Sequence, residues 1–166
     1  MKRLYYSFAA IFVVFLFLAC SRTEKAAVGS APPFVLSTIK SDRLNLGDYR
    51  GKVVLLEFFA SWCPPCRMMA PELKSVYEKY RGKGLIVLAI AIDDGPEALS
   101  AVKNFVNEFS VPYPVMIDDG TVSRQYQVIS IPTSFIIDKQ GKITNRHIGL
   151  LSDLTGTLSK EIEILL

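Results

Sequence analysis

The sequence predicts a single α/β domain preceded by a short apolar leader. Strand-length runs of consecutive apolar residues alternate with segments whose apolar residues recur at helical spacing, and this alternation is typical of an α/β fold. A pair of cysteines stands where the first such run gives way to the first such helix. At 166 residues the chain has the length of one domain with a substantial core.

The first 20 residues have the composition of an export signal. Lys2 and Arg3 precede an apolar stretch from Leu4 to Ala19, and Cys20 follows it. The stretch is short for a transmembrane helix, which takes roughly 20 apolar residues. Its end resembles the lipobox of bacterial lipoproteins, so we expect residues 1–20 to be a lipoprotein-type signal peptide with Cys20 as the lipid anchor. An uncleaved anchor and a cleaved soluble form are the alternatives, and each of them places the rest of the chain outside the cytoplasm.

The rest of the chain is nearly balanced in charge. The formal net charge is +3, and Lys2 and Arg3 supply two of the 19 basic residues, so the other 17 nearly balance the 16 acidic ones. Such a balance does not favour a polyanion, and no nucleic-acid partner is expected. Residues 21–31 are small and polar without a hydrophobic period, which predicts a flexible tether. The domain is then expected to cover residues 32–166.

The first predicted strand is Val53–Phe59, a continuous apolar run of the kind found in central strands that are covered on both faces. The turn-rich segment 43–52 leads into it. Pro71 lies within the helix that follows the cysteines and should kink it. Apolar residues at helical spacing define this helix before Gly82 and Gly84 end it; they are Leu73, Val76, Tyr77 and Tyr80.

The next strand and helix repeat the alternation. Residues 85–92 predict a second buried strand. For the helix that follows, Asp94 or Gly95 offers a cap and Pro96 suits the first turn. The apolar stripe of this helix consists of Leu99, Val102, Phe105, Val106 and Phe109.

The last part of the chain predicts a strand, a hairpin and a final helix. A third strand is expected at residues 113–117 and a short helix at 121–126. Strands at 134–138 and 142–146 flank a glycine-containing turn, which predicts a β-hairpin. Ser152 is expected to cap the last helix, whose apolar side carries Leu154, Leu158, Ile162 and Leu165.

Cys63 and Cys66 are the two cysteines of the predicted domain and stand at a strand–helix junction. Unpaired N–H groups and the positive end of the helix dipole stabilise a thiolate there, so the pKa of the Cys63 thiol should lie below the roughly 8.5 of a free cysteine. Cys63 is therefore the expected nucleophile, which attacks a disulfide and forms a mixed disulfide. Cys66 is one helical turn away and can release the product by closing the Cys63–Cys66 bond.

Two other interpretations of the pair remain open. A zinc site usually takes four Cys, His or acidic ligands, and the domain offers two cysteines and His147, which is distant in sequence. A structural disulfide across so short a loop would contribute little stability. Redox exchange is favoured, because a Cys-x-x-Cys beside an α/β pattern is the expected signal of a thioredoxin-like fold. Neither a metal nor an organic cofactor is then expected, since the redox-active Cys63–Cys66 disulfide carries the electrons.

The segment Glu57–Arg67, EFFASWCPPCR, resembles the active-site segment of the TlpA/ResA-like thiol-disulfide oxidoreductases, a branch of the thioredoxin superfamily. The resemblance continues through residues 46–52, 131–133 and 135–142 and covers nearly all of the predicted domain. It implies a thioredoxin-like mixed sheet flanked by helices. Residues 93–113 match the strand–helix insertion of this branch, although ordinary cover for the sheet is the favoured interpretation of the helix there.

The same resemblance implies a docking surface for a partner. Pro132 matches the family's cis-proline, whose loop Ile131–Thr133 faces the cysteines and offers backbone groups to a bound strand; a trans turn residue is the alternative. Trp62 matches the aromatic residue before the nucleophile. It is expected to shape the docking surface together with Pro64 and Pro65, and a buried core position is the alternative.

Glu57, six residues before Cys63, matches the buried acid that exchanges protons with the resolving cysteine in thioredoxins. Burial would raise its pKa toward the range useful for proton transfer, whereas an acid at the strand edge would reach solvent. The chain departs from the family at Met69, where members frequently carry a glutamate, so an acid function there is absent or transferred to Glu57. His147 is interpreted as a surface or strand-face residue, because the copper-delivering relatives that use a histidine have a wider cysteine spacing.

Together these residues imply thiol–disulfide exchange outside the cytoplasm. The resemblance implies a membrane-anchored reductase of disulfides in exported proteins, with a part in cytochrome c maturation and a membrane thiol reductant as electron donor. A monomer is expected. The alternatives are a disulfide-forming oxidant, a thiol peroxidase, and a tethered binding module whose cysteines only form a bridge. The redox direction depends on a small energy difference, because about 30 mV of potential corresponds to about 1.4 kcal/mol.

Overall fold

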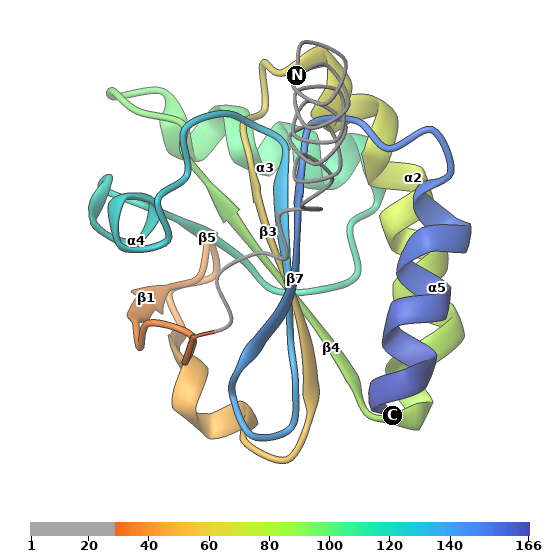
Figure 1. Cartoon of the computed structure of the whole chain (residues 1–166). Coiled ribbons are helices and arrows are strands. Elements are labelled where there is room, and N and C mark those ends of the chain that lie inside the picture. Colours follow the sequence, from red (N-terminus) through yellow and green to blue (C-terminus); the bar gives the residue numbers. More distant parts are fainter. Residues whose placement is uncertain (1–28) are drawn as a thin grey trace, which may run out of the picture.

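The computed structural model describes residues 29–166, so the predicted signal peptide, its Cys20 anchor and residues 21–28 of the predicted tether lie outside the described residues. A five-stranded mixed sheet in the order β5-β4-β3-β6-β7 forms its centre (Figure 1). β3, β4 and β5 run parallel, whereas β6 and β7 form an antiparallel hairpin beside β3. The strands are β3 (Val53–Phe59), β4 (Leu85–Ala91), β5 (Val115–Ile117), β6 (Thr133–Ile137) and β7 (Ile143–Ile148).

β3 is the central strand of the sheet, and every one of its residues is buried. Val53 and Leu55 join the core on one face, and Leu56 and Phe58 join a second core on the other. A strand buried on both faces is what a continuous apolar run predicts. The one charged residue of this strand, Glu57, therefore has no solvent-facing side available to it.

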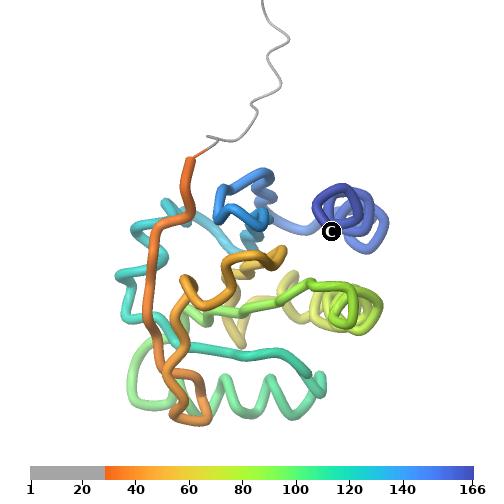
Figure 2. Tube along the Cα trace, turned by 90° about the horizontal axis from the view of Figure 1, so that it is seen from below, coloured from red at the N-terminus to blue at the C-terminus, as the bar shows by residue number. Residues whose placement is uncertain are grey.

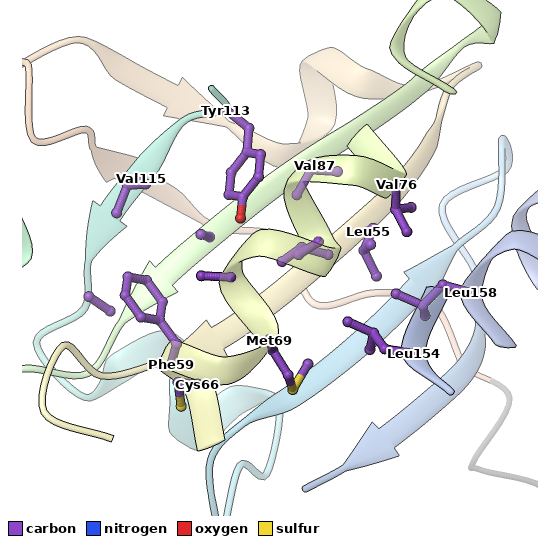
Figure 3. Close-up of a cluster of buried hydrophobic side chains, with 14 of the residues drawn as sticks. Leu55, Phe59, Cys66, Met69, Val76, Val87, Tyr113, Val115, Leu154 and Leu158 are labelled. Atoms are coloured by element: carbon purple, nitrogen blue, oxygen red, sulfur yellow. The ribbon is translucent and has the colours of Figure 1, made fainter. Parts of the chain in front are cut away.

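Three helices cover one face of the sheet. They are α2 (Pro64–Tyr80), α3 (Ala98–Phe109) and α5 (Leu154–Leu165), and their apolar sides contribute to the first core. Figure 3 shows α2 and α5 residues meeting the strands in this core. A 3-10 turn, η2 (Arg81–Lys83), ends α2. Within residues 29–166, no helix combines the length and hydrophobicity that crossing a membrane requires.

Shorter elements cover the other face. The second core is closed by α4 (Thr121–Gln125), by the 3-10 helix η1 (Leu46–Tyr49), and by a small hairpin of β1 (Val35–Ser37) and β2 (Arg43–Asn45). Figure 2 shows this hairpin, in orange, on the opposite side of the molecule from α2 and α5. The sequence did not predict β1 and β2, because strands of three residues are too short to display a hydrophobic period.

The first described residues pair with the turn between β6 and β7. Ser30 forms a bridge with Lys142, and the Ala31 N–H donates to the Gly141 carbonyl oxygen at 2.9 Å. The Ile143 N–H donates to the Gly29 carbonyl oxygen at 3.0 Å. Ordered contacts with the domain thus begin three residues before the boundary predicted at residue 32.

The start of α3 differs from the sequence-based expectation. The helix begins at Ala98 with Glu97 at its N-cap, and the Glu97 side chain makes no capping hydrogen bond, so the prediction of a cap at Asp94 or Gly95 is wrong. The Ala98 N–H instead donates to the Gly95 carbonyl oxygen at 3.2 Å, because the chain first turns after leaving β4. Leu99, in the first turn of this helix, is exposed, although the predicted apolar stripe includes it.

The structure also refines the predictions for the last helix and for α2. Asp153, rather than Ser152, caps α5, because its carboxylate directly precedes the first helical residue and accepts from the Gly156 N–H at 2.9 Å. α2 continues as one helix of 17 residues through Pro71. The predicted hairpin and short helix are confirmed as β6–β7 and α4.

Candidate active site

The two sulfurs lie where β3 passes into α2. Cys63 is the N-cap residue of α2 and Cys66 lies in its first turn, and a disulfide bond joins them with 5.3 Å between their Cα atoms. Pro64 and Pro65 occupy the first helical positions, where a missing N–H costs no helical hydrogen bond. The first N–H that the helix can offer is that of Cys66, and it donates to Cys63 Sγ at 3.3 Å. In the reduced protein this donor and the helix dipole favour a thiolate at Cys63.

The backbone that leads to the first cysteine is held from two sides. Asp93, which follows β4 and is buried, accepts from the Ser61 N–H at 3.0 and 3.2 Å and also from the Ser61 hydroxyl. Arg67 of α2 donates to the Ser61 carbonyl oxygen at 3.3 Å, pairs with Glu108 of α3 and lies over the Phe109 ring. The sequence did not predict these contacts of Ser61, because an acidic residue after an apolar strand is usually interpreted as a turn residue.

The predicted cis-proline loop lies beside the cysteines. The Ile131–Pro132 peptide bond is cis, so the alternative of a trans turn is wrong. β6 begins directly after this bond, and Thr133 pairs with Phe58 near the end of β3, which places the loop at the cysteine-bearing end of the sheet. The Pro132 carbonyl oxygen accepts from the Gly149 N–H at 2.8 Å, which ties the loop to the end of β7.

The predicted docking residues differ in exposure. Trp62 is 66% exposed, so the alternative of a core position is wrong, and its side chain is free to contact a partner. Pro64 is exposed beside it. The remaining predicted docking residues are partly or fully buried and offer a partner mainly backbone groups; they are Pro65, Ile131, Pro132 and Thr133.

Further apolar side chains surround this end of the molecule. Ile129 is 85% exposed just before the cis-proline loop, and Ile148 and Leu150 are exposed at the end of β7. Met68 is exposed on α2, two residues after the second cysteine. The sequence does not mark these four as surface residues, because large apolar side chains are most often buried.

Glu57 lies buried in the middle of β3 with only 4% of the residue exposed, which overturns the alternative of an acid at a strand edge. Burial raises the pKa of its carboxyl to about 7, and a hydrogen bond from the Ser134 hydroxyl, at 2.5 Å, opposes this rise. Glu57 pairs with Ala89 of β4 and with Ser134 of β6 in the sheet. A carboxyl with this pKa exchanges protons readily near neutral pH.

Glu57 and Cys66 line one small cavity of about 20 Å³. Met69, at the position where the resembling family often has a glutamate, is buried and also lines it. Figure 3 shows Met69 and Cys66 on the side of α2 that faces the sheet. The structure therefore places Cys66 and Glu57, the acid that the sequence singled out, on the same cavity, and the wall at position 69 is apolar.

His147 is separate from the cysteine pair. It lies on β7, and its Nε2 is 2.7 Å from Glu161 Oε2 of α5, which confirms the prediction of a strand-face residue. Glu161 also accepts from the Asn145 amide at 2.8 Å. Within residues 29–166 no group of three or more His, Cys, Asp or Glu side chains is placed to hold a metal ion. The redox-active group of the site is the cysteine pair.

Comparison with known proteins agrees with this geometry. Residues 28–146 match the model of the AhpC/TSA family. The thiol-disulfide oxidoreductase ResA of Bacillus cereus is 38% identical over 143 residues, which cover 85% of this chain and 77% of ResA. The thioredoxin-like protein YneN of Bacillus subtilis is 34% identical over 122 residues, which cover 74% of this chain and 71% of YneN.

A solved structure shares the fold closely. The thiol:disulfide interchange protein of the thioredoxin family from Chlorobium tepidum superposes with a TM-score of 0.74 at 27% identity and covers 84% of this chain and 97% of its own. The predicted thioredoxin-like fold with a mixed sheet flanked by helices is confirmed. The chain therefore belongs to the AhpC/TSA family, and its relatives and its disulfide-bonded cysteine pair identify it as a thiol-disulfide oxidoreductase.

Proposed function

We propose that this thiol-disulfide oxidoreductase is a membrane-anchored, extracytoplasmic reductase of disulfides in exported proteins, including those handled in cytochrome c maturation. The observation that carries the proposal is the position of Cys63 Sγ at the N-terminus of α2, where the Cys66 N–H donates to it, beside a cis-proline loop and exposed apolar side chains. Its electron donor is a thiol reductant in the membrane.

The reaction uses two displacements at sulfur. The Cys63 thiolate attacks one sulfur of the partner's disulfide; the new bond joins Cys63 to the partner, and the other sulfur leaves with the electron pair and takes up a proton. Cys66 then loses its proton to the Glu57 carboxylate and attacks Cys63 Sγ. The Cys63–Cys66 disulfide forms, the partner's second sulfur leaves as a thiolate, and the partner has gained two electrons. The membrane reductant returns those electrons to the cysteine pair.

The surface around the cysteines favours a protein partner over a small disulfide. Trp62, Ile129, Ile148 and Leu150 expose apolar side chains on segments that flank the reactive pair and the cis-proline loop. Backbone groups of that loop can pair with an extended segment, while the apolar side chains contact the residues next to its cysteine. The chain needs no second subunit for this contact, and we propose that it acts as a monomer.

The first prediction concerns the division of labour between the sulfurs. In the full chain, Cys63→Ser should reduce insulin disulfides no faster than buffer containing the same reductant, because the N-cap of α2 then carries no sulfur and Cys66 is buried. Cys66→Ser should accumulate a mixed disulfide with insulin that a non-reducing gel resolves. Cys20→Ser is the matched control and should match wild type in detergent. Equal, negligible rates for wild type and Cys63→Ser would favour the tethered binding module instead.

The second prediction concerns redox direction. The Cys63/Cys66 couple should have a potential nearer to the about −270 mV of thioredoxin than to the about −120 mV of a strong periplasmic oxidant. Equilibration of the full chain with a series of glutathione buffers, followed by alkylation and mass measurement, gives this value. A potential near the oxidant end would reverse the proposed direction and make the protein a disulfide-forming enzyme.

The third prediction concerns the anchor. Mass spectrometry of the mature amino terminus should find a chain that begins at Cys20 and carries lipid, and Cys20→Ala should lose that modification. An unmodified amino terminus at Met1 would show an uncleaved anchor. An unlipidated terminus beyond residue 20 would show a released form, and either result would contradict lipidation.

The fourth prediction concerns Glu57. Because folding raises its pKa from 4.5 to about 7, the folded protein holds a proton that the unfolded chain releases between these values, so stability falls as pH rises from about 4.5 to about 7. At pH 8, Glu57→Gln should therefore unfold at a higher denaturant concentration than wild type, with a free energy of unfolding that is larger by at most about 3 kcal/mol. At pH 4 the substitution should not increase the free energy of unfolding. The same variant should lose the inflection near pH 7 in the rate of resolution. A variant with an unchanged rate profile would remove Glu57 from the proton path.

A further inference from the structure

Tyr113 is a buried titratable residue for which the exchange reaction above has no role. It lies two residues before β5, is 7% exposed, and meets the Tyr77 ring of α2 edge-on with 5.6 Å between ring centroids. Figure 3 shows its ring entering the first core with the hydroxyl directed inward, on the side of Phe59. Burial, with a smaller contribution from the Glu57 carboxylate, raises the pKa of this hydroxyl. Tyr113 therefore keeps its proton near neutral pH and presents a hydrogen-bond donor.

The hydroxyl of Tyr113 shares its surroundings with the resolving cysteine. Tyr113, Glu57 and Cys66 line the same cavity of about 20 Å³, and the other lining residues are apolar. A cavity of roughly 10–15 Å³ already accommodates one water, provided that the water finds two to four polar partners. Among the lining residues, Glu57, Tyr113 and Cys66 carry polar groups, so the cavity has the size and the chemistry for a single bridging water.

We propose that Tyr113 is a positioning residue for the resolving step, whose hydroxyl donates through one cavity water to the Glu57 carboxylate and holds it ready to accept the Cys66 proton. This inference rests on the proposed function, because it concerns the second displacement of the same reaction. It assigns Tyr113 a part in the reaction, although Tyr113 neither touches the partner nor carries electrons.

The resolving step moves one proton and one electron pair. The Cys66 thiol gives its proton, through the water, to Glu57, and the Cys66 thiolate attacks Cys63 Sγ of the mixed disulfide. The bond between Cys63 and the partner breaks, and the partner's sulfur leaves with the electron pair. Glu57 later passes the proton to solvent. Tyr113 keeps its own proton throughout, and its hydrogen bond favours the ionised carboxyl over the neutral one.

Few polar groups on the elements packed against Glu57 can form a hydrogen bond with its carboxyl. On the β4 side its strand neighbour is Ala89, which has no polar side chain. On the other side its carboxyl already receives the Ser134 hydroxyl at 2.5 Å, so the cavity is where a further donor can act. The polar and titratable groups that face Glu57 are Ser134 of β6, Cys66 of α2 and Tyr113, with His147 of β7 beyond Ser134 and held by Glu161 of α5.

The test compares Tyr113→Phe with Tyr77→Phe in the oxidised full chain in detergent. Carbon-13 NMR of the glutamate carboxyls, with the Glu57 signal assigned from Glu57→Gln, gives the Glu57 pKa. Loss of one hydrogen bond to the ionised form should change the ionisation constant by a factor of roughly 2–10, so Tyr113→Phe should raise the pKa by up to about 1 unit. Tyr77→Phe removes a hydroxyl from the same aromatic pair and should leave the pKa unchanged.

The reaction provides a second readout. At pH 7 a raised Glu57 pKa leaves less carboxylate, so closure of the mixed disulfide in Tyr113→Phe should slow by up to about 5-fold and recover above about pH 9. A Glu57 pKa that is unchanged in Tyr113→Phe would overturn the proposal whatever the activity. A shifted pKa in a protein that fails to reduce insulin would retain the positioning contact and reject the proposed function.

The wild-type protein offers a check that needs no variant. A water held in the cavity should give a nuclear Overhauser effect between the water resonance and the methyl group of Met69, which lines the same cavity. The exposed methyl group of Met68, on the adjacent residue, is the reference for contact with bulk water. Absence of a long-lived water signal at Met69 would also overturn the proposal.

Discussion

The chemistry of this protein depends on one constraint, which is that the buried strand β3 ends where the helix α2 begins. Burial of β3 on both faces fixes its carboxyl end, and the Asp93–Ser61 contact fixes the short segment that follows. The Cys63 N–H donates to the Ala60 carbonyl oxygen at 3.2 Å, so Cys63 itself is tied to this segment. Because Cys63 is then the N-cap of α2, its sulfur receives the first donor of the helix without any induced movement.

The same burial that positions the cysteines sets the chemistry of Glu57. A carboxyl in the centre of a sheet loses its hydration, and a single hydroxyl from Ser134 compensates only part of that loss. The result is a proton acceptor with a pKa near neutrality at the cost of some folding stability. A polar residue that breaks the pattern of a buried strand is a local inconsistency, and such inconsistencies in natural proteins concentrate at functional sites.

The site combines segments that are far apart in the chain, and the sheet explains why they meet. The parallel strands β3 and β4 end at the same edge, so the cysteine segment and Asp93 lie together there. β6 runs antiparallel to β3, and therefore its first residues, with the cis-proline before them, reach the same edge. Tyr113 enters from the connection between α3 and β5, which places this connection against the cavity.

The sequence by itself determined the alternation of strands and helices, the strand that carries Glu57, and the pairing of Cys63 with Cys66, because each depends on local spacing or on an apolar run. It misplaced the caps of α3 and α5, since several adjacent polar residues can cap a helix and only the backbone path selects one. Tertiary structure alone decided the Asp93–Ser61 contact and the shared cavity of Glu57, Cys66 and Tyr113. These contacts bring Asp93 to Ser61 and Tyr113 to Cys66, residues separated by tens of positions, and no periodicity records which distant side chains the packing of a sheet brings together.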